Sequence, residues 1–138
     1  MPERIVFVLT LAALVAIGIL ATRAWSARKT RGVTHRPPDW SALGLQPDGR
    51  RTLIAFSSPS CAACHQAQAP AIELAQQRIG AEAIRIIPVD AAEQPHVARA
   101  FGVMTVPSTV IVGSAGQVVA INQGFAPSTR LVEQLQRA

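Results

Sequence analysis

The stretch that decides the fold runs from residue 52 to residue 64 and reads Thr52-Leu53-Ile54-Ala55-Phe56-Ser57-Ser58-Pro59-Ser60-Cys61-Ala62-Ala63-Cys64. Its apolar start is typical of a buried strand, and the serine-rich segment that follows predicts a turn. From Cys61 to about Ile79 we expect a helix, bent at Pro70. Cys61 would then lie at a helix N-terminus, where free N–H groups and the helix dipole favour a thiolate. Cys64 follows one turn later on the same face, where it can close a disulfide with Cys61.

The rest of the chain after residue 38 alternates between strand and helix patterns. Apolar runs predict further strands at 83–89, 107–112 and 117–122, and helices are expected at 94–101 and 127–137, after a short helical turn at 39–45. A glycine-rich turn at 113–116 predicts a hairpin. This order predicts an α/β domain in which a parallel β-α-β unit is followed by an antiparallel hairpin.

Four features of this domain resemble the thioredoxin superfamily, over roughly residues 50–138. They are the strand 53–56, the Cys-x-x-Cys helix start, the Val106-Pro107-Ser108-Thr109 entry into a strand, and the Gly116-Gln117-Val118-Val119 hairpin. The likeness is greatest to membrane-anchored bacterial thioredoxin-like proteins. It implies a thioredoxin-like fold, with a central mixed sheet flanked by helices, and thiol–disulfide oxidoreductase activity. It also implies a cis bond between Val106 and Pro107, with the Val106 backbone free to pair with an extended substrate.

The chain departs from the family pattern at several positions. Ser60 replaces the usual tryptophan, and Ala62-Ala63 replaces the usual Gly-Pro between the cysteines. Ala55 aligns with a buried acid, and Ile86 with a lysine on the next strand. The missing acid leaves the deprotonation of Cys64 to a bound water or to the substrate's own thiolate. These changes indicate a dedicated partner in place of a general thioredoxin role.

Thiol chemistry then assigns the two cysteines their roles. Cys61 as thiolate attacks a substrate disulfide, and Cys64 resolves the mixed disulfide. We expect protein thiol or disulfide substrates, a separate recycling partner, a monomer, and no cofactor other than the redox-active Cys61–Cys64 disulfide. No metal is expected.

Three other interpretations of the cysteines remain open at this stage. Cys61 to His65 is also a C-x-x-C-H string, the signature of covalent c-type haem, for which Met104 could serve as second axial ligand. Zinc would need a fourth ligand, and His35 and His96 do not supply a pair at a recognised spacing. The pair could also be a static disulfide in a redox-inert binding module.

The N-terminal segment, residues 1–38, has a different character from residues 39–138. Residues 5–22 carry no charge, and as a helix they would span roughly 27 Å, close to the thickness of a bilayer core. Trp25 follows where an interfacial aromatic would lie. We expect a retained single-pass membrane anchor rather than a cleaved signal peptide. Residues 23–38 are expected to form a basic, solvated linker, and residues 39–138 the thioredoxin-like domain.

The net charge of +5 belongs to this segment. Residues 1–38 hold six basic residues and one acid, whereas residues 39–138 hold seven of each. A domain with no net charge and no basic stripe is a poor nucleic-acid binder. Five of the basic residues follow the apolar span, and this favours a cytoplasmic domain. The family resemblance points the other way, because anchored proteins of this kind often face outward.

Overall fold

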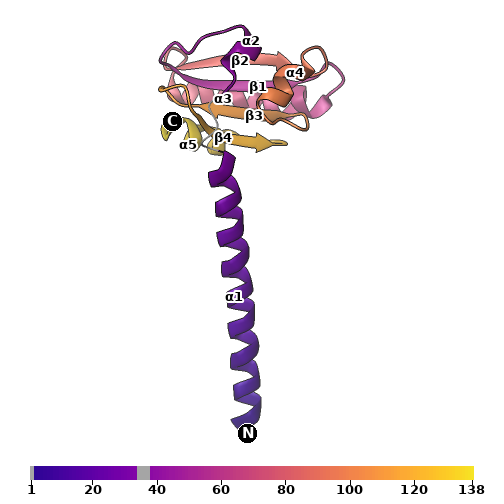
Figure 1. Cartoon of the computed structure of the whole chain (residues 1–138), viewed down its shortest axis with the longest axis vertical. Coiled ribbons are helices and arrows are strands. Elements are labelled where there is room, and N and C mark those ends of the chain that lie inside the picture. The colour runs from indigo at the N-terminus through magenta and orange to yellow at the C-terminus, as the bar shows by residue number, and fades with distance from the viewer. Residues whose placement is uncertain (1, 34–37) are drawn as a thin grey trace. The chain divides into compact units, whose positions relative to one another are not determined.

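The computed structural model describes residues 2–33 and 38–138; within residues 2–33 it describes side chains at Glu3 and residues 5–22. The chain divides into two units, residues 1–32 and residues 33–138, and each is described by itself (Figure 1).

The first unit is a single helix, α1 (Pro2–Val33). It is longer than the span expected at 5–22 and continues through much of the segment that we expected to be linker. Alanine, arginine and lysine after Thr22 are good helix formers, and extending an existing helix costs far less than starting one. The side chain of Trp25, expected at a membrane interface, and residues 34–37 of the linker lie outside the described part.

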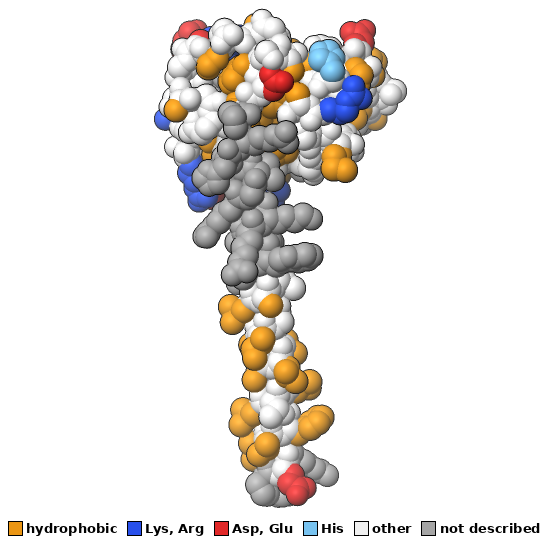
Figure 2. All heavy atoms as spheres, viewed as in Figure 1, with side chains coloured by type: hydrophobic (Ala, Val, Ile, Leu, Met, Phe, Trp, Pro, Cys, Tyr) orange, Lys and Arg blue, Asp and Glu red, His pale blue; other side chains and the backbone are white. Residues whose placement is uncertain are grey.

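The apolar side chains of α1 are distributed around the helix and are exposed (Figure 2). The hydroxyls of Thr10 and Thr22 donate to the carbonyls of Phe7 and Ile19, each at 2.9 Å, so both hydroxyl protons are satisfied within the helix. By length and composition, Ile5–Thr22 is a candidate membrane span.

The second unit is built on a mixed sheet of four described strands in the order β2-β1-β3-β4. The strands are β1 (Arg51–Ser57), β2 (Ile84–Asp90), β3 (Ser108–Val112) and β4 (Val118–Gln123). β1 and β2 are parallel, and β3 is antiparallel to both β1 and β4. The crossover and the hairpin predicted from the sequence are therefore confirmed. Among the described strands β2 pairs with β1 alone, so it forms one edge of the sheet.

Helices cover both faces of this sheet, which explains the continuous apolar run from Leu53 to Phe56 in β1 (Figure 1). Leu53 packs toward α3 (Ala69–Ile79) and α5 (Ser128–Gln136), in a cluster that includes Ile72, Leu131 and Leu135. Ile54 and Phe56 face the opposite cluster. Helices α2 (Trp40–Leu43) and α4 (Pro95–Ala100) contribute to that cluster through Trp40, Leu43, Val97 and Ala98.

The helix predicted from Cys61 to Ile79 is divided in the structure. After two α-helical residues comes a π-helical segment, η1 (Cys64–Gln68), and then α3 begins at Ala69. Pro70 lies in the first turn of α3 rather than inside a continuous helix. Because proline has no N–H, it cannot donate to the carbonyl four residues earlier. Where the sequence predicted a bend, the helix accommodates Pro70 with a π-helical turn just before it, which holds about one residue more than an α-helical turn.

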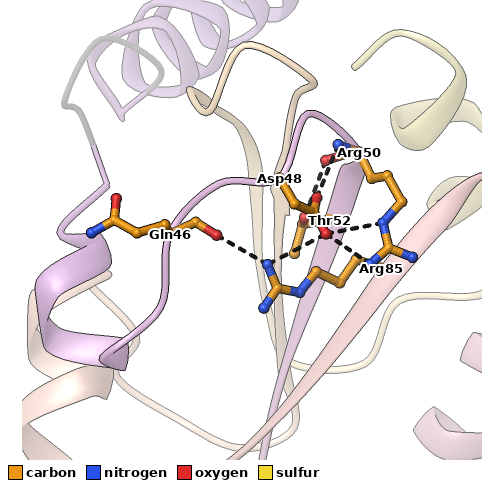
Figure 3. Close-up of polar contacts among 5 residues, drawn as sticks. All are labelled: Gln46, Asp48, Arg50, Thr52 and Arg85. Atoms are coloured by element: carbon orange, nitrogen blue, oxygen red, sulfur yellow. Dashed lines mark hydrogen bonds and ion pairs between the residues drawn. The ribbon is translucent and has the colours of Figure 1, made fainter.

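At the start of β1 and β2, charged side chains join the loop before β1 to the sheet (Figure 3). Asp48 accepts hydrogen bonds from the Arg50 guanidinium at 2.7 and 3.0 Å, and the Arg85 guanidinium lies 3.6 Å away. Arg85 also donates to the carbonyl of Gln46 at 3.0 Å. The hydrogen bond from the Arg50 side chain is the main cause that lowers the pKa of Asp48 below its ordinary value. We call this group, Gln46, Asp48, Arg50 and Arg85, the arginine end of the sheet.

Candidate active site

The strand directions bring three loops to the end of the sheet opposite the arginine end. Phe56 near the end of β1 pairs with Ser108 at the start of β3, which in turn pairs with Gln123 at the end of β4. The segments 57–64, 102–108 and 123–127 therefore adjoin the same end of the sheet, and together we call them the disulfide end. In α/β sheets with parallel strands, ligand and reaction sites are formed at the carboxyl ends of these strands.

Cys61 and Cys64 form a disulfide in the first of these segments, with their Cα atoms 5.3 Å apart. Cys61 is half-buried, whereas Cys64 is only 4% exposed. The N–H of Cys64 donates to Sγ of Cys61 at 3.2 Å, and the N–H of Cys61 donates to the carbonyl of Ser58 at 3.1 Å. The more accessible sulfur is thus the one that has a backbone donor and precedes the helical run. This is the environment that stabilises a thiolate once the disulfide is reduced.

The second segment contains the Val106–Pro107 peptide bond, which is cis. Pro107 is buried and Val106 is half-buried, directly before β3. The hydroxyl of Ser108 donates to the carbonyl of Thr105 at 2.7 Å and closes the turn around the proline. Val106 and Pro107 therefore lie at the disulfide end together with both cysteines.

The residues considered for haem or zinc are spread over the structure. Nε2 of His65 lies 3.2 Å from the carbonyl oxygen of Ser58, and Met104 is 90% exposed on the loop before Val106. His96 is exposed on α4, and His35 lies outside the described residues. Within the described part of the chain, no three His, Cys, Asp or Glu side chains gather into a metal-binding group.

Ala55 and Ile86, which the resemblance aligned with an acid and a lysine, both pack against the cluster beneath α3 and α5. In the described part of the chain the buried polar side chains are all neutral: Thr52, Gln68, Ser108, Thr109 and Asn122. The buried polar groups of the described interior are thus amides and hydroxyls, and positions 55 and 86 hold apolar side chains.

Two of the side chains that organise this end were not expected from the sequence. The buried amide of Gln68, in η1, donates to the carbonyl of Ala126 at 3.0 Å and accepts from its N–H at 2.9 Å. Gln123 accepts from the N–H of Met104 at 3.1 Å and donates to the carbonyl of Gly102 at 2.8 Å. One signal in the sequence could have indicated the role of Gln68. This residue lies on the same apolar helical stripe as Cys64, Ala71, Ile72 and Ala75, and a polar side chain in such a stripe needs a hydrogen-bond partner.

Comparison with known proteins points to one family. The family model described as Thioredoxin matches residues 40–137. Thioredoxin 1 of Nostoc sp. is 32% identical over 85 residues, which cover 62% of this chain and 77% of that protein. Thioredoxin of Bacillus subtilis is 33% identical over 85 residues, which cover 62% of this chain and 79% of that protein.

Solved structures agree on the fold. Fasciola hepatica thioredoxin superposes with a TM-score of 0.57 at 25% identity, over 72% of this chain and 90% of that one. Chloroplastic thioredoxin z gives a TM-score of 0.59 at 16% identity, over 74% of this chain and 89% of that one. The region that the family model matches, residues 40–137, contains the sheet and the disulfide and does not include the N-terminal apolar helix.

Proposed function

Because the chain belongs to the thioredoxin family and is a thiol–disulfide oxidoreductase, we propose that it acts on protein substrates through Cys61 as nucleophile and Cys64 as resolving thiol, while α1 tethers it to a membrane. The observation that carries the assignment of roles is the asymmetry of the disulfide. Cys61 is accessible and receives a backbone hydrogen bond, whereas Cys64 is buried behind it.

The proposed exchange has two steps. In the reduced protein, the Cys61 thiolate attacks one sulfur of a substrate disulfide; a Cys61–substrate bond forms, and the other substrate sulfur leaves as a thiolate. The Cys64 thiolate then attacks Cys61, which releases the first substrate sulfur and forms the Cys61–Cys64 disulfide seen here. The substrate gains two electrons and the protein loses two. The reverse sequence oxidises a substrate dithiol, and a recycling partner with its own dithiol or disulfide restores the starting state.

Removal of the proton from Cys64 needs an acceptor in this scheme. Ala55 stands where the resemblance would place a buried acid, and the buried polar side chains in the described residues are neutral. The substrate thiolate that leaves in the first step is generated beside the mixed disulfide and is basic enough to accept a thiol proton. We therefore assign that role to the leaving substrate thiolate. Cys64 would then be deprotonated only after a substrate disulfide has reacted with Cys61.

Substrate binding in this proposal uses the backbone next to the cis-proline. Val106 precedes Pro107 at the disulfide end and is half-buried. An extended substrate segment adding there as a short strand would place its own cysteine against Cys61.

The roles of the cysteines can be tested by alkylation and trapping. In the reduced protein near neutral pH, Cys61 should react with iodoacetamide well before Cys64, because it is more exposed and its sulfur accepts a backbone hydrogen bond that favours the thiolate. A Cys64→Ser variant should accumulate a mixed disulfide on Cys61, and mass spectrometry of that adduct would identify the partner. Faster alkylation of Cys64 would reverse the assignment.

The tether can be tested separately from the chemistry. The full chain should stay in the membrane fraction through high salt and carbonate washing, because the 18 residues of the span are apolar and uncharged. Deleting residues 1–38 should release a soluble domain with no net charge. Fusions after Ala138 then decide the side of the membrane: alkaline phosphatase activity reports an exported domain, and fluorescence of a protein that folds only in the cytoplasm reports the side favoured by the basic residues after the span.

A further inference from the structure

Gln68 lies in the helical run that begins at the disulfide. Among the described residues, its amide is the one buried side chain that connects this run to the loop after β4. It comes four residues after Cys64 and is 4% exposed. Both of its polar atoms bond the same residue, Ala126, 58 positions later in the chain. One bond goes to the peptide group before the Ala126 Cα and the other to the peptide group after it, so the backbone on both sides of that Cα is held in position.

This contact holds a short loop between β4 and α5. Ala126 is fully buried, while Phe125 beside it is 50% exposed. Gly124, with φ of +86°, turns the chain out of β4 into this loop, and Pro127 begins the entry into α5. The loop is thus fixed at Ala126 and presents an aromatic side chain at the next position.

The amide of Gln68 does what an apolar side chain of similar size could not do. An apolar residue of similar size at position 68 would match the neighbouring Ala71, Ile72 and Ala75 but would leave the N–H and the C=O of Ala126 without this partner. The glutamine satisfies both backbone groups and connects the helix that begins at the disulfide to the loop that presents Phe125. The arrangement couples the position of Phe125 to that of the disulfide.

We propose that Gln68 is a positioning residue for substrate recognition: it fixes the loop 124–127 so that Phe125 packs against an apolar side chain next to the target cysteine of a protein substrate. The inference rests on the proposed function and adds the class of substrate, a polypeptide with an apolar residue near its disulfide. A small disulfide lacks that residue and does not use the contact.

The test compares a protein disulfide with a small one. The full chain in detergent micelles is reduced, freed of reductant, and mixed in single-turnover reactions with insulin or with oxidised glutathione. Gln68→Leu should slow the reaction with insulin by about tenfold while the reaction with glutathione stays within about twofold of wild type. Gln66→Leu, at an exposed position in the same η1 segment, is the matched control and should change neither rate.

A conservative variant separates positioning from a general loss of structure. A glutamate at position 68 lacks the donor for the Ala126 carbonyl when ionised and regains it when protonated. For Gln68→Glu, the ratio of the insulin rate to the glutathione rate should be low in alkaline buffer and should approach the wild-type ratio on mild acidification. A ratio that does not change with pH would overturn the proposal.

Phe125→Ala keeps the experiment decisive if Gln68→Leu fails to fold, because an exposed side chain contributes little to the core. It should reproduce the selective loss with insulin, and the double variant should be no slower than either single one. A normal insulin rate in Phe125→Ala, or an equal loss on both substrates in Gln68→Leu, overturns the inference and leaves the proposed function intact. If the wild-type protein reduces neither disulfide, the proposed function itself fails.

Discussion

The two ends of the sheet are held together by different chemistry. At the arginine end, the contacts are between charged side chains that are partly exposed: Arg50 has 46% and Asp48 32% of its side-chain surface exposed. At the disulfide end, the contacts that join the loops come from the amides of Gln68 and Gln123. An amide supplies a donor and an acceptor at fixed positions and keeps the same charge at any pH that the domain tolerates. The comparison indicates that loops around the reactive sulfurs are positioned by groups that do not titrate or respond to salt, whereas the far end relies on screened ion pairs.

The largest expected effect is a loss of activity, and it should follow only from substitutions at the disulfide end. Cys61→Ser should abolish insulin reduction, because the remaining Cys64 is buried and cannot reach a substrate disulfide, and Cys64→Ser should stop at the mixed disulfide. Asp48→Asn at the arginine end should retain the wild-type rate. Rates are measured in single-turnover reactions of the full chain. A large loss of activity in Asp48→Asn would mean that the two ends are coupled, contrary to this comparison.

The next effect concerns stability close to the disulfide end. Asn122 in β4 exchanges two hydrogen bonds with Gln134 of α5, at 2.8 and 2.9 Å, and donates to Thr109 at 2.9 Å. Asn122→Ala leaves buried polar atoms without partners and should lower the free energy of unfolding by about 1–3 kcal/mol in urea titrations. Gln136→Ala, at an exposed position of the same helix, should leave the urea midpoint unchanged. Equal midpoints for both variants would show that the amide pair contributes nothing net.

A smaller effect is expected at the loop before Pro107. Gln123→Ala removes the bonds to Met104 and Gly102, and since the amide is exposed, water replaces part of what is lost. The free energy of unfolding should fall by about 0.5–1.5 kcal/mol, and the rate with insulin should fall more than the rate with oxidised glutathione. Gln77→Ala on α3 serves as the control, because it removes an exposed amide distant from this loop in sequence. An unchanged ratio of the two rates would confine Gln123 to a structural role.

The smallest effect is expected at the arginine end and should depend on pH and salt. The pKa of Asp48 is lowered in the folded state, mainly by the hydrogen bond from Arg50. Its contribution to stability is therefore present above the pKa of the unfolded chain and is lost as the pH falls through the lowered folded value. Asp48→Asn should reduce the melting temperature slightly near neutral pH, less in high salt, and not at all in strong acid. A difference from wild type that persists in acid would assign the effect to packing instead.

Much of the domain could be predicted from the sequence because its signals are local. The strand predicted at 52–56 is apolar from Leu53 to Phe56, since both of its faces are covered, and Leu131 and Leu135, one turn apart, form the buried face of the helix predicted at 127–137. Val106-Pro107 was assigned a cis bond through the family resemblance, since a valine before proline carries no such preference. The disulfide followed from the three-residue spacing of the cysteines at a helix start.

The features that escaped prediction depend on contacts between distant residues or on small energy differences. Gln68 and Ala126 are 58 positions apart, and nothing in either local sequence indicates the other. The π-helical segment Cys64–Gln68 differs from an α-helix by one residue in a turn, which the apolar spacing does not resolve. The continuation of α1 to Val33 reflects a modest propensity of Arg, Lys and Ala residues that we had interpreted as linker.

The edge position of β2 has a consequence for how the domain tolerates crowding. An open strand edge can pair with the same edge of another copy and start aggregation. A tether that confines many copies to one membrane surface would raise that risk, because neighbours meet far more often than in free solution. Pro88, exposed in the middle of β2, has no N–H to offer an incoming strand, and Arg85 brings a charge to the same strand. Pro88 and Arg85 thus protect the edge of β2 against self-association. This protection matters most if the proposed anchor confines many copies to one membrane surface.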